Sequence, residues 1–580
     1  MIFDIDEESK KLKEYVSKYD SETFAPDVAT LFAYIDTPRI EMYPFQGLDS
    51  PLRQLSYILA LNLTSNQSKV TEIEVASNDE WKEIVVSAIK CKAGYYDLLL
   101  NDLQKVENFN TYYETVLPVF FDYFDTSKLN YEEQELKRID LLFTPFNQAL
   151  ENKIGLNVQE ILEIYNIIDN QLFININKPF EFLKDPECKE FSDYQKQNNI
   201  RPHDWDYLGT NENIKLFVKH FKNRGERLKI SLEDLYPNFD NEKINIFFKL
   251  FTIDRNETSF LYYTNDNPVL SNPIVKLIDS KYLILDPKIL LFAIYDRLYK
   301  IIDGQEKKIF DKFQTHKGKY LENRVCSIFQ NYFKKEAHIY KEYTTSIGGS
   351  GQDVLVLGKS IAIIIEVKNK KSAIPHSYPK DIKKLFETIS KYFKNSIQEG
   401  YDQCFRVKEL FDQDRIFDIY DEKGEKLYTV NPKKYPNVFN IIVTEERFKK
   451  PQIDLSKLLD LNPNDDCYPL SISVDDLEVI LLTLKKKKLG LSHLIEFLYL
   501  REQLHGRIDS NDELEIWGAL INSKKFKIPD NPKLTFRTYP EMSFFYDELY
   551  KSGLGFENEK NFDKKKSGNW DFYEPYKALQ

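Results

Sequence analysis

Three side chains suited to a hydrolytic metal site lie close together in residues 351–368, which read G-Q-D-V-L-V-L-G-K-S-I-A-I-I-I-E-V-K. Asp353 follows a glycine-rich turn, and Glu366 and Lys368 end an apolar run. Two carboxylates that face one another repel unless a cation lies between them, and their oxygens favour Mg²⁺ or Mn²⁺. These residue types therefore point to a carboxylate pair that binds a divalent ion beside one ammonium group.

A predicted β-hairpin brings the three residues together. V-L-V-L and I-A-I-I-I-E-V-K read as two strands joined at Lys359-Ser360. A turn centred between residues 359 and 360 sets Asp353 opposite Glu366, and alternation along the strand keeps Lys368 on the same face. A pairing shifted by one residue would need a bulge to restore the cluster. We expect Asp353 and Glu366 to be metal ligands, with Lys368 acting on the attacking water or on phosphate charge.

The segment resembles the core of the PD-(D/E)XK nuclease superfamily, which has the restriction-endonuclease-like fold. The resemblance lies in the order of its parts: G-x-D, a hairpin, and an apolar strand that ends E-V-K. The resemblance covers about residues 310 to 445 and departs from the family pattern at Gln352, where the family name has proline. It implies an Mg²⁺-dependent endonuclease, with Mn²⁺ as the other candidate ion. It also implies a metal-binding and catalytic glutamate on the preceding helix, matched by Glu322, and a catalytic glutamine on the following helix, for which Gln398 is the candidate and Gln403 the next.

The sequence around the motif is basic although the chain is acidic. Residues 311–400 contain 16 Lys and Arg against 9 Asp and Glu, whereas the whole chain has a net charge of −12. This distribution predicts one region that faces a polyanion. Lys370 and Lys371, just after the motif, are predicted to contact nucleic-acid phosphates; a solvated strand exit is the alternative. For Glu322 the alternative is a surface or capping glutamate.

The pattern from residue 305 onward is helix, strand, hairpin, helix, strand. Its predicted elements are a helix over 316–335, strands over 337–345 and 438–444, a helix from Pro379 to Phe411 and a hairpin over 416–430. The strand ending at Lys368 is apolar on both faces, as in the middle of a covered sheet. We therefore predict a mixed α/β nuclease core whose central sheet is flanked by helices.

Three regions are predicted along the chain. Residues 1–304 are expected to be mainly helical, with a role in recognition, regulation or assembly and room for two subdomains. Residues 305–449 form the predicted nuclease domain, and residues 450–580 an α+β region. In this last region Y-P-L-S-I-S-V-D-D-L predicts a strand followed by a helix that Asp475 or Asp476 caps.

Composition sets the class of protein. The chain is 42% hydrophobic and 14% aromatic, which favours packed structure over disorder. Its five cysteines are far apart, which argues against a zinc ribbon and a disulfide framework. A start without an apolar core, and no apolar run long enough for a bilayer, predict a cytoplasmic protein without a membrane partner. No Walker loop is present.

The leading functional expectation is a metal-dependent nuclease that hydrolyses phosphodiester bonds of DNA. By analogy of fold, such an enzyme suits a bacterial restriction or anti-phage defence effector. The alternatives are a catalytically silent nucleic-acid-binding or scaffold module of the same fold, and an RNA-cleaving member. Expected partners are DNA, a second copy if both strands are cut, or another protein of the same defence system.

Overall fold

The computed structural model describes residues 3–32, 48, 50–74, 76–125, 130–198, 200, 205–222, 225–370, 382–523, 531, 533–557 and 559. The chain is mixed α/β, as predicted, and it divides into two compact units. The first comprises the described parts of residues 1–98 and 124–310, and the second those of 99–123 and 311–562. The predicted motif lies in the second unit.

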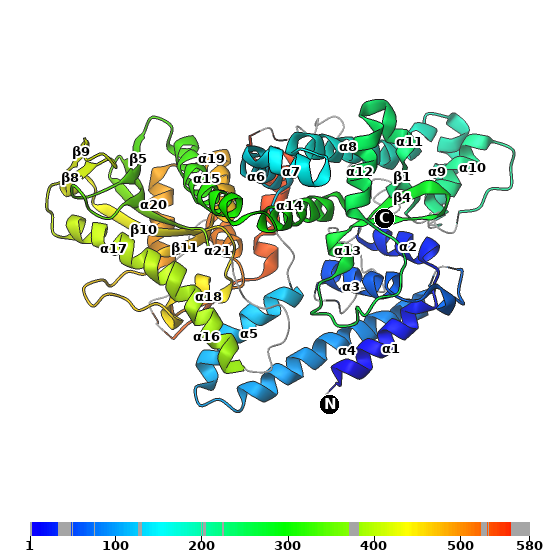
Figure 1. The fold of residues 1–580 in the computed structure, drawn as a ribbon, viewed down its shortest axis with the longest axis horizontal. Coiled ribbons are helices and arrows are strands. Elements are labelled where there is room, and N and C mark those ends of the chain that lie inside the picture. Colours follow the sequence, from blue (N-terminus) through cyan, green and yellow to red (C-terminus); the bar gives the residue numbers. More distant parts are fainter. Residues whose placement is uncertain are drawn as a thin grey trace. The chain divides into compact units, whose positions relative to one another are not determined.

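The first unit is mainly helical (Figure 1). Its helices, the first of which is capped by Asp4, are α1 (Ile5–Ser17), α2 (Ser21–Phe32), α3 (Pro51–Leu63), α4 (Asn78–Leu103, which continues into the second unit), α6 (Glu132–Phe143), α7 (Asn147–Ile154), α8 (Val158–Phe182), α9 (Pro186–Gln197), α10 (Glu212–Lys222), α11 (Leu232–Leu235), α12 (Asn241–Phe251), α13 (Pro268–Ser271) and α14 (Pro287–Asp303). It also contains a small sheet that the sequence did not predict, with strands β1 (Lys229–Ser231), β4 (Lys281–Ile284), β3 (Ile274–Lys276) and β2 (Thr252–Ile253) in that order. Strands of two to four residues are too short to show alternation.

A five-stranded mixed sheet forms the centre of the second unit (Figure 1). Its order is β11 (Leu470–Ser473), β10 (Asn437–Thr444), β7 (Ile361–Lys368), β6 (Gln352–Gly358) and β5 (Ala337–Tyr343). The pairs β5–β6 and β6–β7 are antiparallel, while β7–β10 and β10–β11 are parallel. Strand β11 therefore extends the core sheet from within the C-terminal region.

The predicted register of the β6–β7 hairpin is confirmed. Val354 pairs with Ile365 and Leu357 with Ala362, which is the pairing expected from a turn at Lys359-Ser360. Ser360 has φ of 87°, the left-handed conformation that lets the chain reverse within two residues. The next pair outward from Val354 and Ile365 would be Asp353 and Glu366.

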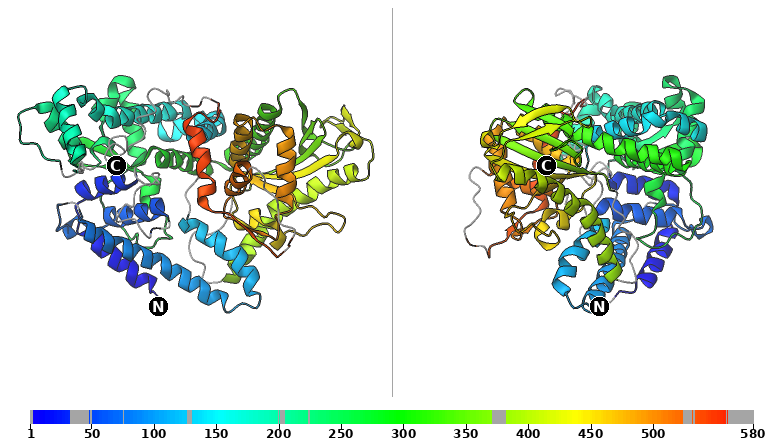
Figure 2. Two further views of the ribbon diagram at one scale, coloured as in Figure 1. Left: turned by 180° about the vertical axis from the view of Figure 1, so that it is seen from behind. Right: turned by 60° about the vertical axis from the view of Figure 1, so that its left-hand side comes forward.

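Helices cover both faces of this sheet. On one face, α17 (Glu399–Asp412) contributes Cys404, Val407 and Phe411 to a buried cluster with Leu355 and Ile364 of the sheet. The other face carries α15 (Lys307–Phe333), α19 (Val474–Lys486) and α20 (Leu491–Glu502), and Figure 2 (left) shows the C-terminal helices in orange in front of the sheet.

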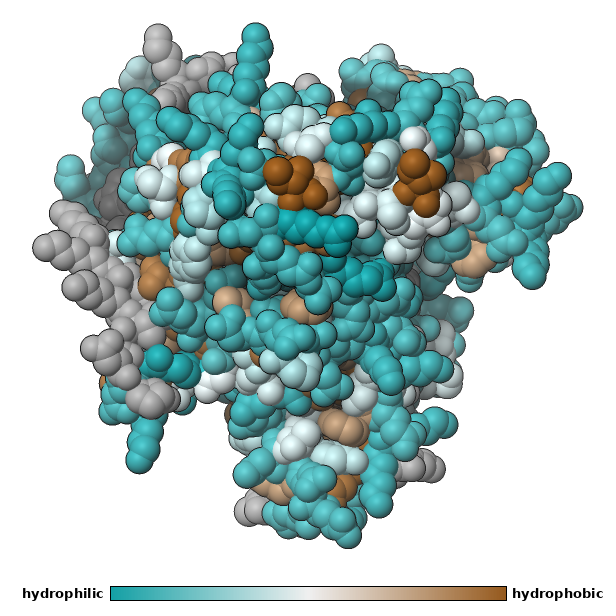
Figure 3. Space-filling model, turned by 90° about the vertical axis from the view of Figure 1, so that its left-hand side faces the viewer, coloured by the Kyte–Doolittle hydropathy of each residue, from teal (hydrophilic) through white to brown (hydrophobic). Residues whose placement is uncertain are grey.

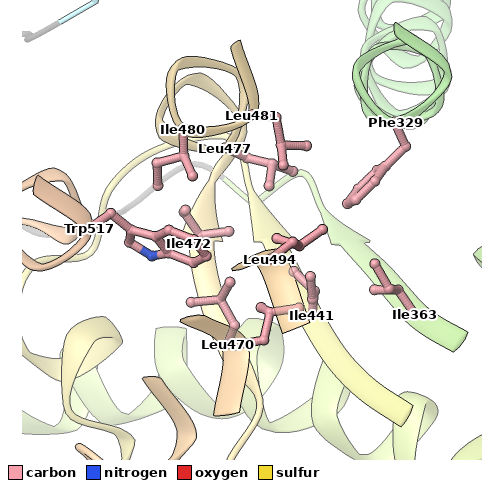
Figure 4. Close-up of a pocket in the computed structure, with 11 residues that line it drawn as sticks. Phe329, Ile363, Ile441, Leu470, Ile472, Leu477, Ile480, Leu481, Leu494 and Trp517 are labelled. Carbon is pink, nitrogen blue, oxygen red and sulfur yellow. The ribbon is translucent and has the colours of Figure 1, made fainter. Parts of the chain in front are cut away.

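A small apolar cavity remains on this second face (Figure 4). Phe329 of α15, Ile363 and Ile472 of the sheet, Leu477 of α19 and Trp517 of α21 (Glu513–Asn522) point toward one another around it. A void lined only by apolar side chains offers water no hydrogen-bond partner. It belongs to the core packing of the sheet and not to a ligand site.

The helix predicted from Pro379 to Phe411 is divided in two. It consists of α16 (Ile382–Phe393), a π-helical turn over Lys394–Gln398 and α17, while residues 379–381 lie outside the described part. The π turn has a wider hydrogen-bond ring than an α-helix, so it changes which side chains face the sheet further along.

The predicted cap of α19 was wrong. Ser473, and neither Asp475 nor Asp476, is the N-cap, and its side chain accepts a hydrogen bond from the Asp476 backbone N–H at 3.2 Å. The two aspartates lie in the first turn, where the helix dipole favours negative charge.

The remaining elements of the second unit lie around this core. They are α5 (Phe109–Asp125), the hairpin β8 (Phe417–Tyr420) and β9 (Lys426–Val430), α18 (Lys450–Ile453), the pair β12 (Ile508–Asp509) and β13 (Phe536–Arg537), and α22 (Phe544–Lys551).

The surface drawn in Figure 3 is mostly hydrophilic, with apolar side chains in small separate spots. Single exposed apolar residues such as Ile347, at 72% exposure, are ordinary on a protein surface. None of the helices in the described part of the chain combines the length and apolar character needed to cross a lipid bilayer.

Candidate metal-binding site

The Asp353 and Glu366 carboxyl groups lie side by side where β6 and β7 meet. The Asp353 backbone N–H donates to Glu366 Oε1 at 3.3 Å, and the Val367 N–H donates to Asp353 Oδ2 at 2.6 Å. These crossed hydrogen bonds fix both side chains on one face of the hairpin. Each carboxyl group keeps a second oxygen that these backbone groups do not use.

Both carboxyl groups are in an environment that disfavours their charged form. Glu366 is only 1% exposed, and burial, followed by the neighbouring Asp353, raises its pKa far above that of a glutamate in water. Burial also raises the pKa of Asp353, against the opposing effects of the Val367 N–H and Lys368. Ionising both acids is unfavourable because their charges lose contact with water and repel each other. A cation bound between them would stabilise the ionised pair.

Lys368 extends over the same face. Its Nζ lies 3.7 Å from Glu366 Oε2, its side chain is 11% exposed, and it donates a hydrogen bond to Gln403 Oε1 of α17. Gly400, one turn earlier on α17, allows the lysine stem to pass close by: a Cβ at that position would lie 3.1 Å from Lys368 Cε. The helix therefore holds the ammonium group at the edge of the carboxylate pair.

The structure does not bring Gln398 to the site. Its side chain donates to Asp402 Oδ1 at 2.9 Å and to the Asp460 carbonyl at 3.0 Å, and it accepts from the Asp460 N–H. Gln398 ends the π-helical turn, whereas Gln403 lies beside Cys404, which faces the Ile364 carbonyl. Gln403, the second candidate from the sequence, is thus the glutamine that contacts Lys368.

Glu322 lies on α15 near Asp353 but is directed to a different partner. Burial, followed by the charge of Asp353, raises the Glu322 pKa to about 7. Its Oε2 lies 3.9 Å from Lys341 Nζ of β5. The ligand atoms of Glu322, Asp353 and Glu366 do not all lie within 4.8 Å of one another. Among the described residues, only Asp465, Asp466 and Cys467 form such a three-ligand group.

That other acidic group offers no better site. The Asp465 carboxylate already accepts a hydrogen bond from the Tyr401 hydroxyl at 3.0 Å and pairs with Lys408 at 3.2 Å. Its charge is therefore balanced by protein groups. The chemistry of a hard divalent ion fits Asp353 and Glu366 better, since a half-buried and a buried carboxylate share one small region beside a single ammonium.

Lys370 and Lys371 are the lysines predicted to contact phosphates. Lys370 donates to the Asn395 carbonyl of the π-helical turn and pairs with Glu399 at 3.1 Å, with its side chain 49% exposed. Its ammonium is therefore shared with α17 while remaining accessible. Lys371 lies outside the described residues.

Sequence reasoning missed Lys341 and Glu342. Both lie at the end of the edge strand β5, and Lys341 Nζ is 3.1 Å from Glu342 Oε1. The loosely alternating strand over 337–345 was predicted, but its register against β6 was not. The signal available in the sequence was two charged residues at the end of a strand, which is common at sheet edges.

Comparisons with known proteins gave no relative: no family model matches the chain, and no curated protein or solved structure matches it. Any functional assignment therefore rests on the geometry of its own residues.

Proposed function

We propose that the protein is a metal-dependent nuclease that hydrolyses phosphodiester bonds of DNA. The observation that carries this proposal is the Asp353–Glu366 carboxyl pair, of which Glu366 is buried, with Lys368 beside it at one end of a hairpin in a mixed sheet. Structural ion pairs combine opposite charges, whereas here two acids share one site. A binding surface for a polyanion would gain nothing from two adjacent carboxylates unless a cation joined them.

The protein groups have separate tasks in this proposal. Asp353 and Glu366 would hold Mg²⁺ through their carboxylate oxygens. When bound, Mg²⁺ lowers the pKa of a coordinated water and offsets charge on the scissile phosphate. Lys368, fixed by Gln403, orients the attacking water or stabilises the added negative charge on phosphorus. The basic segment 311–400 supports a nucleic acid as the substrate.

The test uses purified full-length protein with plasmid, linear duplex, single-stranded DNA and RNA, in Mg²⁺ or in EDTA. We expect Mg²⁺-dependent DNA cleavage that is lost in Asp353→Ala and Lys368→Ala. Lys426→Ala, which removes an exposed lysine paired with Asp418 at 2.8 Å, is the control and should cut normally. Cleavage that persists in either site variant would reject the assignment.

The same experiment separates the alternatives. Metal-independent binding without cutting would identify a silent nucleic-acid-binding module. Cleavage confined to RNA would identify an RNA-cleaving enzyme with the same site.

A further inference from the structure

The ammonium group of Lys341 lies among three oxygen atoms from two elements. Its Nζ is 3.1 Å from Glu342 Oε1, 2.9 Å from Asn323 Oδ1 and 3.9 Å from Glu322 Oε2. Two carboxylates and an amide oxygen around one positive charge make the kind of environment that cations occupy in proteins. In this protein the positive charge among these oxygens is the Lys341 ammonium, which belongs to the chain itself.

The strand register places this group next to the proposed metal site. Lys341 pairs with Val354 and Tyr343 with Gln352, so Glu342 and Asp353 lie between these two pairs on neighbouring strands. Val354 in turn pairs with Ile365, next to which Asp353 and Glu366 lie on β6 and β7. Three acidic residues therefore lie on β5, β6 and β7 at the same end of the sheet, where neighbouring strands are about 4.8 Å apart. Glu342 has φ of 51°, a left-handed conformation that non-glycine residues seldom adopt.

The charges of the region indicate how many ions it can accept. Glu322, Glu342, Asp353 and Glu366 contribute four negative charges when ionised. Lys368 lies beside Glu366, and Lys341 lies between Glu322 and Glu342. Among these six groups two negative charges remain, which a single divalent ion would balance; Lys319 adds one further positive charge that acts on Glu342.

We propose that Lys341 takes the place of a second divalent cation, so that the site binds one metal ion, at Asp353 and Glu366. This inference rests on the proposed function, because it takes that pair to be the metal site. Glu322 then orients Lys341 instead of binding metal, in keeping with the 3.9 Å between its Oε2 and Lys341 Nζ.

The test counts bound ions with the full chain and Mn²⁺ as the probe, using the loss of the free-ion EPR signal. The wild type should bind one Mn²⁺. Lys341→Met keeps the apolar stem but removes the charge, so Glu322 and Glu342 become free to hold a second ion, and the count should rise to two. Adding Glu342→Gln to Lys341→Met should return it to one. Lys426→Met, on the β9 hairpin, is the matched control and should bind one.

Other outcomes overturn the proposal in distinguishable ways. One ion in both the wild type and Lys341→Met would show that Lys341 does not replace a cation, and would leave the Asp353–Glu366 site standing. Two ions bound to the wild type would likewise show that Lys341 does not replace a cation. No ion in the wild type would reject both the inference and the proposed function. Circular dichroism checks the fold of Lys341→Met, and Lys341→Gln provides a second neutral variant.

Discussion

Two glutamines five positions apart on one helical segment have different relations to the site. Gln403 accepts a hydrogen bond from Lys368, whereas Gln398 is bonded to Asp402 and Asp460. In the proposed mechanism Gln403 fixes the Lys368 ammonium through a charge-assisted hydrogen bond. We expect Gln403→Leu to lower kcat by about ten-fold, corresponding to about 1.4 kcal/mol.

Gln398→Leu is the internal control, because it removes the same group from the same segment, and it should leave kcat unchanged. Equal losses in both variants would contradict a specific role for Gln403. Steady-state cleavage of a labelled duplex in Mg²⁺ measures the difference.

The buried acid at residue 366 makes stability depend on pH in the absence of metal. The Glu366 pKa is raised above its ordinary value of 4.5 in the folded chain. Above pH 4.5 the folded chain therefore keeps a proton that the unfolded chain has lost. Stability falls with rising pH wherever the folded state binds more protons. In EDTA, the wild type should therefore lose stability from about pH 4.5 upward, with Glu322 adding its share up to about pH 7.

Glu366→Gln cannot ionise, so it should reduce this loss and stabilise the metal-free protein at pH 8 by on the order of 2 kcal/mol. Urea midpoints at pH 5 and pH 8 measure the effect, with the exposed Glu409→Gln as the control. Mg²⁺ should restore stability to the wild type at pH 8 and not to Glu366→Gln. Identical pH dependence in both chains would count against the buried acid pair.

At the scale of an element, α17 comes unusually close to the strand end at Gly400. A Cβ at this position would lie 3.0 Å from Ile442 Cγ2 and 3.1 Å from Lys368 Cε. Gly400→Ala should gain about 1 kcal/mol of helix propensity, offsetting much of the cost of crowding. We therefore expect a small change in unfolding midpoint but a several-fold loss of cleavage, because Lys368 must move.

Glu409→Ala, at an exposed position of the same helix, should change neither property. A Gly400→Ala chain with full activity would show that the lysine stem has room to adjust.

The same elements show what the sequence could and could not predict. The Asp353–Glu366 juxtaposition was predictable because a two-residue turn determines the register of a tight hairpin from local sequence alone. The choice between Gln398 and Gln403 was not, since the π-helical turn alters the helical phase and leaves no clear mark in composition. Lys341 was missed because its role depends on the pairing of β5 and on a helix residue 18 positions away.

At the scale of the whole molecule, the unit that contains the site is assembled from two separated stretches of chain. Residues 99–123 belong to it together with 311–562. Tyr112 stacks on Phe386 of α16 with ring centroids 4.3 Å apart, and Glu114 pairs with Lys457 at 2.7 Å. A chain beginning at residue 305 would therefore lack part of its own unit.

Tyr112→Ala in the full chain tests this assembly. It should destabilise the site-bearing unit by about 1 kcal/mol and speed proteolysis within α16. Tyr113→Ala is the control, since Tyr113 is 39% exposed and stacks on Phe109 of its own helix. Equal protease sensitivity in the two variants would mean that the Tyr112 stack contributes nothing.

The π-helical turn at Lys394–Gln398 also matters for anyone aligning this chain with other sequences. An alignment that carries a constant helical repeat through the turn would be out of phase by one position, which is a rotation of about 100° around the helix axis. Side chains that face the sheet from α17 would then be matched to solvent-facing positions elsewhere. A one-residue gap placed within 394–398 would keep equivalent sides of the helix together.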